Sequence, residues 1–282
     1  MKRTYLLAVI TVCLATPVNA DSIGLHLGGK IWKNTTTGTF GNKNSQIDYG
    51  AVEEQQNSLF IAIEHPIPFL PNARISLNSL ETFGTVTTTS VYSADTNTAH
   101  VDIVDQTAVD ANFDINFVDY SLYYQVFDND LLAFDLGLTA RAFGGDVSYT
   151  DKTDRVTTTR DFIWDGEEHD DHDYHNIVER SQLTSEKSVS ANDVVPMIYL
   201  SSKVNLPISG FSLLLEGNYS LLGDHTIYDY QLAIDYDLIT NRMIDLNMNI
   251  GYQVTDLALE DMNGIYTNLE FNGGFIGFSM RF

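Results

Sequence analysis

Cysteine is almost absent from this chain, and that absence narrows what can hold the chain together. The 282 residues include a single cysteine, Cys13, which lies in an N-terminal segment that we expect to be removed. The remaining chain then has no thiol, which excludes a disulfide framework and a thiolate metal site. It must be stabilised either by a packed core or by insertion into a membrane.

Basic residues are scarce as well. The chain has 15 lysines and arginines against 38 aspartates and glutamates, which gives a formal net charge of −23. A protein that binds nucleic acid needs a basic surface to neutralise phosphates, so we predict no nucleic-acid partner. We interpret the excess of acidic residues as a solvated surface, of the kind found where salt or divalent cations screen the charge.

Long apolar runs are also missing, apart from a short one near the N-terminus. Lys2 and Arg3 precede an apolar run over 5–14, and Val18 and Ala20 stand at the −3 and −1 positions of a cleavage site. This pattern predicts a cleavable secretory signal peptide at 1–20, because a membrane-spanning helix would need about 20 apolar residues. No later run is long enough to be such a helix, which leaves one mature domain at 21–282.

What the sequence does contain is alternation of apolar and polar residues with a period of two. The alternation recurs in stretches of about ten residues, rich in Tyr, Phe, Leu, Ile and Val and separated by turn residues. A strand that crosses an outer membrane needs about 9–11 tilted residues. We therefore predict ten such strands, at about 22–32, 58–64, 73–80, 111–126, 132–143, 194–206, 211–221, 227–236, 246–253 and 266–282.

The connections between these stretches differ in length. Those after the second, fourth, sixth and eighth stretches are short, whereas those after the first, third and fifth are long, at about 34–57, 81–110 and 144–193. Short periplasmic turns and long extracellular loops are typical of outer-membrane barrels, and so is a final aromatic residue such as Phe282. The predicted fold is all-β: a single closed antiparallel up-and-down transmembrane β-barrel of ten strands.

This fold predicts where the protein resides and what surrounds it. We expect it in the outer membrane of a Gram-negative cell, in contact with lipid and lipopolysaccharide, inserted there by the barrel-assembly machinery and monomeric. One local irregularity is also predicted. Phe113 and Phe117 share a face of the fourth stretch, whereas Tyr120 and Leu122 continue one residue out of step, which indicates a β-bulge near Val118.

The interior of such a barrel is expected to be polar. Closing the barrel removes open sheet edges, whose unpaired backbone groups would cost several kcal/mol each in lipid. A barrel of about ten strands is narrow and is largely filled by its inward side chains. The inward phase carries charges of both signs, which predicts a plugged lumen lined by Lys30, Arg74, Asp135, Arg141, Glu216, Asp229 and Arg281.

The third long connection contains the densest group of potential metal ligands. His169, His172 and His175 are spaced by three residues, with Asp171 and Asp173 between them. Imidazoles flanked by carboxylates could bind Zn²⁺, Cu²⁺ or Ni²⁺. The alternative is a solvated acidic tip with weak affinity for divalent cations, and no other cofactor is expected.

A protease site at the barrel rim is a further possibility. Ten-stranded surface proteases of the omptin kind place paired aspartates and an Asp–His couple there, and Asp224 and His225 could supply the couple beside Asp105, Asp110 or Asp114. Adjacent residues of a strand point to opposite faces, however, which favours a turn over a catalytic couple. We therefore expect no enzyme.

Four segments carry a resemblance to a known family. They are 64–68 (EHPIP), 127–137 (FDNDLLAFDLG), 223–230 (GDHTIYDY) and 264–282. With them the mature chain resembles the uncharacterised proteobacterial outer-membrane β-barrels of the OMP_b-brl type, a family that brings no known catalytic or binding residues.

The sequence thus leaves three functions open. The favoured one is a non-enzymatic barrel with a structural or surface-interaction role. The second is a narrow passive pore for small ions or solutes, and the third is a metal-binding external loop or a rim protease.

Overall fold

The structure is a computed structural model in which β-strands form nearly all of the described chain. It describes residues 23–42, 45–48, 50, 52–67, 69–96, 99–162, 174–190, 192–207, 209–221, 225–241, 243–262 and 265–282. Within these ranges, no helix is long and apolar enough to cross a membrane. The predicted signal peptide at 1–20 lies outside them and stays a prediction. The strands are β1 (Gly24–Asn42), β2 (Ser45–Asp48), β3 (Val52–Glu64), β4 (Asn72–Asp95), β5 (Ala99–Asp128), β6 (Leu132–Phe162), β7 (Tyr174–Ser190), β8 (Val194–Asn205), β9 (Phe211–Ser220), β10 (His225–Thr240), β11 (Asp245–Met262) and β12 (Ile265–Arg281).

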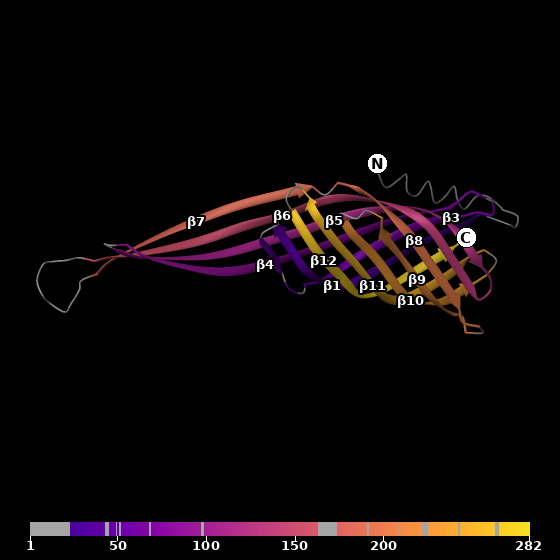
Figure 1. The fold of residues 1–282 in the computed structure, drawn as a ribbon. Helices are drawn as coiled ribbons and strands as arrows, with labels where there is room; N and C mark the ends of the chain where they lie inside the picture. Colours follow the sequence, from indigo (N-terminus) through magenta and orange to yellow (C-terminus); the bar gives the residue numbers. More distant parts are fainter. Residues whose placement is uncertain are drawn as a thin grey trace, which may run out of the picture.

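Ten of these strands close into a ring, as predicted. The antiparallel order is β1-β3-β4-β5-β6-β8-β9-β10-β11-β12, and β12 pairs back onto β1. The closing seam is long, because its register runs from His26 opposite Arg281 to Gly41 opposite Tyr266. Among the described strands, β2 pairs with β1 alone and β7 with β6 alone, so both lie outside the ring. The ring appears in Figure 1 as the group of tilted strands in which β12 lies beside β1.

The outer wall of the ring is apolar because the strands keep their period of two. Along β9, for example, Leu213, Leu215 and Tyr219 are exposed, whereas Leu214, Glu216 and Asn218 between them are half-buried and Ser212 and Ser220 at the two ends are buried. Tyrosines stand on this outer face on several strands, including Tyr120, Tyr230 and Tyr252, each about half exposed. The wall therefore has the surface that contact with lipid requires.

The two ends of the barrel differ. At one end the strands are joined by short turns, after β3, β5, β8 and β10, and there Phe282 exchanges backbone hydrogen bonds with Leu25. We call this the turn end. At the opposite end, the hairpin end, several strands continue far past the ring (Figure 1).

These continuations form a sheet of their own, which we call the sheet extension: residues 81–95 of β4, 99–114 of β5, 144–162 of β6 and 174–190 of β7. β4 stays paired with β5 as far as Asp95 opposite His100, and β6 stays paired with β7 as far as Phe162 opposite Tyr174. The expectation that 34–57, 81–110 and 144–193 are loops was therefore wrong, because most of these residues are strand. Their β-branched, threonine-rich segments favour strands without the alternation by which membrane strands are recognised.

The predicted bulge near Val118 was also wrong. Pairing of β5 with β6 is continuous through this region, and the register shifts only between Gln125 and Phe127. Phe113 and Phe117 share one inward face with Asp119, whereas Tyr120 points outward. The apparent slip in the sequence arises because the inward face changes along the strand from apolar to polar.

Candidate functional site

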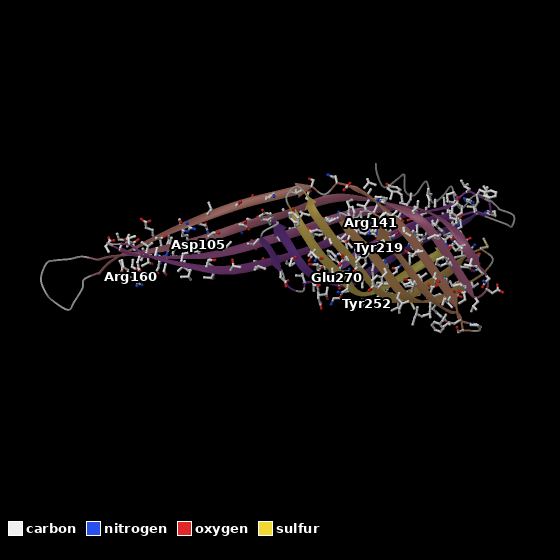
Figure 2. The ribbon with its side chains drawn as sticks, viewed as in Figure 1. Asp105, Arg141, Arg160, Tyr219, Tyr252 and Glu270 are labelled. Carbon is white, nitrogen blue, oxygen red and sulfur yellow. The ribbon has the colours of Figure 1, made fainter. Side chains whose placement is uncertain are left out.

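The interior of the barrel holds two layers of side chains, and the layer nearer the turn end is ionic. Its centre is Arg141 on β6, whose side chain is 1% exposed. Arg141 Nε and Nη2 donate to the two carboxylate oxygens of Asp119 on β5 at 2.7 and 2.8 Å, and Nη2 also donates to Asp229 on β10. Since β6 and β10 are not neighbours in the ring, the contact with Asp229 crosses the lumen. Figure 2 shows Arg141 among the barrel strands.

A second ion pair crosses the lumen in another direction. Arg74 Nη1 on β4 donates to Glu216 Oε2 on β9 at 2.9 Å, and the Tyr199 hydroxyl donates to the same carboxylate at 3.4 Å. The Arg74 guanidinium also lies over the Phe60 ring, at 4.1 Å from its centroid. A buried charge is tolerated only when it is paired and hydrogen-bonded, and both arginines meet that condition.

The remaining predicted lumen charges lie around this centre. Lys30 Nζ donates to Gln231 Oε1, across the lumen on β10. Asp135 is partly buried, and its Oδ1 has no hydrogen-bond partner among the described residues. Arg281 differs from the others, because it is exposed at the turn end, opposite His26 and Asp245 in register.

Two further pairs continue the ionic layer toward the turn end. Lys203 Nζ donates to Asp235 Oδ2 at 2.7 Å. The Glu64 carboxylate lies 3.0 Å from His26 Nε2 and accepts from the Tyr123 hydroxyl at 3.2 Å. A partly open cavity of about 40 Å³ lies instead at the centre of the ionic layer, lined by Lys30, Arg74, Asp119, Arg141, Glu216 and Asp229 among others. A cavity of that volume holds about three water molecules, since each of them needs roughly 10–15 Å³.

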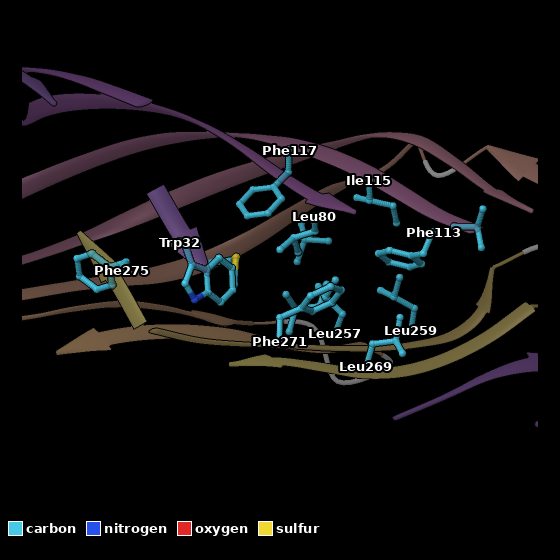
Figure 3. Packing of buried hydrophobic residues seen from close by; sticks show 14 of the residues in the cluster. Trp32, Leu80, Phe113, Ile115, Phe117, Leu257, Leu259, Leu269, Phe271 and Phe275 are labelled. Carbon is cyan, nitrogen blue, oxygen red and sulfur yellow. The ribbon is translucent and has the colours of Figure 1, made fainter. Parts of the chain in front are cut away.

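The layer nearer the hairpin end is apolar, which the sequence analysis missed. Phe113 on β5 packs against Phe271 on β12 with ring centroids 6.0 Å apart, although these strands are not neighbours, so the contact fills the lumen. Figure 3 shows side chains from opposite walls meeting there. The buried cluster comprises Trp32, Leu80, Phe113, Ile115, Phe117, Val147, Val189, Val195, Met197, Ile227, Ala233, Leu257, Leu259, Leu269, Phe271 and Phe275.

A signal for this layer was present in the sequence. Phe113, Ile115 and Phe117 keep the phase of Asp119, a charged inward residue, and so had to face inward with it. We interpreted the change of polarity along this strand as a bulge. If these residues are taken as one continuous inward face, they predict an apolar plug at the hairpin end.

Polar pairs tie the strands of the sheet extension together. Arg155 on β6 donates to both carboxylate oxygens of Asp105 on β5, at 2.7 and 2.6 Å, and this bond with its charge holds the pKa of Asp105 below its ordinary value. Nearer the tip, His100 bonds to Asp95 and to Asp102. These acceptors, Asp95 foremost, raise the pKa of His100. Figure 2 shows Asp105 and Arg160 along the extension.

The predicted metal ligands are not brought together by any described contact. His169, Asp171, His172 and Asp173 lie outside the described residues, and only the backbone of His175, in β7, is described. In the part of the chain that the structure does describe, no three His, Cys, Asp or Glu side chains gather into a metal site. Metal binding by this segment stays a prediction, to be tested by Zn²⁺ titration before and after replacing its three histidines.

The residues considered for a rim protease are placed as follows. Asp224 lies outside the described residues, and of His225 only the backbone is described, at the start of β10. Asp105 is bound to Arg155, Asp110 accepts from Thr85 and Lys152, and Asp114 accepts from Asn116. All three aspartates therefore have structural partners on the strands of the extension or the rim.

Comparisons with known proteins find outer-membrane barrels among solved structures. No family model and no curated protein matches the sequence. The outer-membrane protease OmpT of Escherichia coli is similar with a TM-score of 0.38 and 12% identity, over 95% of this chain and 99% of that one. The translocator domain of the autotransporter NalP from Neisseria meningitidis has a TM-score of 0.34 and 11% identity, over 100% and 95%. Ail, the attachment invasion locus protein of Yersinia pestis, has a TM-score of 0.26 and 6% identity, over 92% and 99%.

Proposed function

We propose that this chain is an integral outer-membrane β-barrel with a closed interior, of the OMP_b-brl type and without enzymatic activity, which acts through the sheet extension. The turn end would face the periplasm and the hairpin end the outside. The apolar wall and the closed ring support the membrane location, since only closed barrels and helices satisfy all backbone groups in lipid. The difference between short turns and long hairpins supports the orientation.

The observation that carries the proposal is the filling of the lumen. Three pairs reach across it: Arg141 with Asp229 and Arg74 with Glu216 in the ionic layer, and Phe113 with Phe271 in the apolar layer. A passive pore needs a continuous polar path, which a layer of packed aromatic and aliphatic side chains opposes. With its interior closed, the barrel offers the extension, rather than a channel, as its largest external feature.

Single-channel conductance in a planar bilayer tests this proposal. Refolded mature protein, shown to be folded by a heat-dependent shift in gel mobility, is expected to give no current steps. Steady steps that scale with salt concentration would overturn the closed interior and favour the narrow pore. In that event Arg74→Gln should change the ion selectivity, because Arg74 lies in the lumen, whereas Arg155→Gln, in the extension, should not.

A further inference from the structure

The sheet extension has two open edges. Past Ser58 opposite Asn78, β3 forms no further backbone pair with β4, but Gln56 Nε2 of β3 still donates to the Glu81 backbone oxygen at 2.7 Å. Beyond that contact, residues 82–95 of β4 pair only with β5. At the other side β7 pairs only with β6. Among the described strands, therefore, each of these edges presents a row of backbone N–H and C=O groups to solvent.

The two edges differ in how they are protected against pairing. Proteins usually guard an open edge with charged residues, proline or a bulge. β7 follows this rule with Glu179, Arg180, Glu186 and Lys187, most of them exposed. In β4 the thirteen residues 82–94, TFGTVTTTSVYSA, include no charged residue and no proline.

This unguarded segment of β4, which we call the β4 edge, is also exposed. Residues 87–95 are exposed without exception, so both faces and the edge are open to solvent there. Three large apolar side chains stand on the β4 edge: Phe83 is 63% exposed, Val91 64% and Tyr92 61%. Threonine, valine and tyrosine favour strand conformation, so the β4 edge is suited to accept a further strand.

We propose that the β4 edge binds the β4 edge of a second copy of this chain, antiparallel and about a two-fold axis at Thr87. This rests on the proposed function only in that the extension must lie outside the membrane. The proposed dimer differs from the monomer that we expected from the sequence, because the sequence alone revealed no open strand edge.

The register about Thr87 makes the β4 edge complementary to itself. On one face Phe83 would stand opposite Val91 of the other copy, and aromatic residues opposite β-branched residues stabilise strand pairs. On the other face Val86 would stand opposite Thr88. Pairing would end at Phe83 opposite Val91, because the Glu81 backbone oxygen already accepts from Gln56 of β3. Glu81 and Asp95 then lie outside the paired segment 83–91, which contains no carboxylate.

Charge favours this segment over the rest of the surface. A chain with a net charge of −23 repels its copies at most points of contact. Along the paired segment itself, between the flanking residues Glu81 and Asp95, the nearest carboxylates lie on β5, at positions such as Asp102, Asp105 and Asp110. Carboxylates on the two β5 strands would be three strand spacings apart, roughly 14 Å, which exceeds the Debye length of about 8 Å at physiological ionic strength.

The antiparallel contact determines where the two barrels lie relative to each other. Both β4 strands run outward from their own barrels, so antiparallel pairing puts the barrels at opposite ends of an eight-stranded sheet. This arrangement suits copies in two facing membranes, and an isologous contact of this kind closes at two copies.

Single cysteines test the contact directly, because the mature chain is expected to have none. Thr87→Cys protein is refolded in detergent, oxidised mildly and run on a non-reducing gel. We expect a covalent dimer, since opposed residues of antiparallel strands have Cα atoms about 4.5–5.5 Å apart, within disulfide range. Thr184→Cys is the matched control, because Thr184 stands at the same level of the extension on the β7 edge and should stay monomeric.

A matched pair of charge variants tests the same contact without a covalent bond. Thr87→Lys sets two like charges opposite each other, and analytical ultracentrifugation should show dissociation of the dimer, whereas Thr184→Lys should leave it intact. A parent that sediments as a monomer with no Thr87→Cys dimer would overturn the proposal. So would cross-linking of Thr87→Cys to Thr184→Cys in a mixture, which would indicate head-to-tail rows. The gel shift shows folding in every case, and conductance decides separately whether the interior is closed.

Discussion

Arg141 is the residue on which the interior most depends. It is buried to 1% exposure and binds two carboxylates, Asp119 and Asp229, on opposite sides of the lumen. Its guanidinium carbon also lies 4.1 Å from the centroid of the Phe117 ring, where the ionic layer meets the apolar one. Removing its charge would leave both carboxylates without the cation they contact, and Asp229 would keep only the hydrogen bond from Asn218 Nδ2.

Arg141→Met should therefore lower the free energy of unfolding by about 3–5 kcal/mol, the usual cost of breaking a buried ion pair from one side. The measurement is equilibrium unfolding in urea from lipid vesicles, followed by tryptophan fluorescence in a Trp164→Phe background, so that the signal comes from Trp32, which is buried in the apolar layer.

Arg155→Met is the control for Arg141→Met. It breaks an equally well-formed pair with Asp105, but in the exposed extension, where solvent weakens ion pairs. Little change is expected. If the two variants were equally stable, the ionic layer would not be what holds the barrel interior together.

At this scale the sequence predicted types of residue better than partners. Alternation alone assigned Arg74, Arg141, Glu216 and Asp229 to the lumen phase, and the structure places all four inside the ring. It could not pair them, since Arg74 and Glu216 are 142 residues apart and meet only once the ring has closed. Arg281 shows a second limit of prediction from alternation. The alternation indicates which face of a strand a residue is on, but not how close to the end of the barrel the residue lies.

At the scale of elements, the sequence located every strand of the ring but misjudged how far several of them run. The fourth stretch was expected at 111–126, whereas β5 spans Ala99–Asp128. The reason is physical: lipid imposes apolar alternation only on the part of a strand that it touches. Outside the membrane both faces of a strand meet water, so the threonine-rich ends of β4 and β6 carry no such pattern.

One point on β6 shows how an element is fixed where it leaves the ring. Gly145 has a φ of +137°, and a Cβ there would stand 2.2 Å from the backbone oxygen of Asp114. Gly144 beside it has open space, its nearest neighbour being Asn192 Oδ1 at 3.9 Å. Of these two residues, therefore, Gly145 alone needs to be glycine.

Gly145→Ala should lower the free energy of unfolding by more than about 1 kcal/mol, because alanine is strained at this φ. Gly144→Ala should change it by less than about 0.5 kcal/mol, as at other unconstrained positions. Urea unfolding of the two variants side by side checks the contrast, and equal effects would mean that the backbone of β6 relaxes freely here.

For the whole molecule, the main feature is that the packed core lies inside the ring and at the base of the extension, not along the rest of it. Phe113, Val147 and Val189 are the cluster residues that belong to the extension, and they lie where its strands leave the barrel. Gly84 lies opposite Ala111 there, and Val147 opposite Val189. The extension can therefore be shortened at these pairs without opening the core.

A variant in which Asn-Gly turns replace both 85–110 and 148–188 should still fold into a closed barrel. We expect it to keep the heat-dependent shift in gel mobility and to remain silent in a planar bilayer. It should also sediment as a monomer, because it lacks the β4 edge. A variant that failed to fold would show that the barrel needs the extension, contrary to the position of the core.

The continuity of β5 and β6 also gives the molecule a mechanical property. Each is a single strand of about 30 residues, roughly 100 Å long, that begins or ends at the turn end and runs past Asp119 or Arg141 to the tip of the extension. A pull at the tip along the strands loads their hydrogen bonds in shear, so that many must break together. Traction applied to the tip would thus be borne by the same two strands that carry the ion pair at the centre of the barrel.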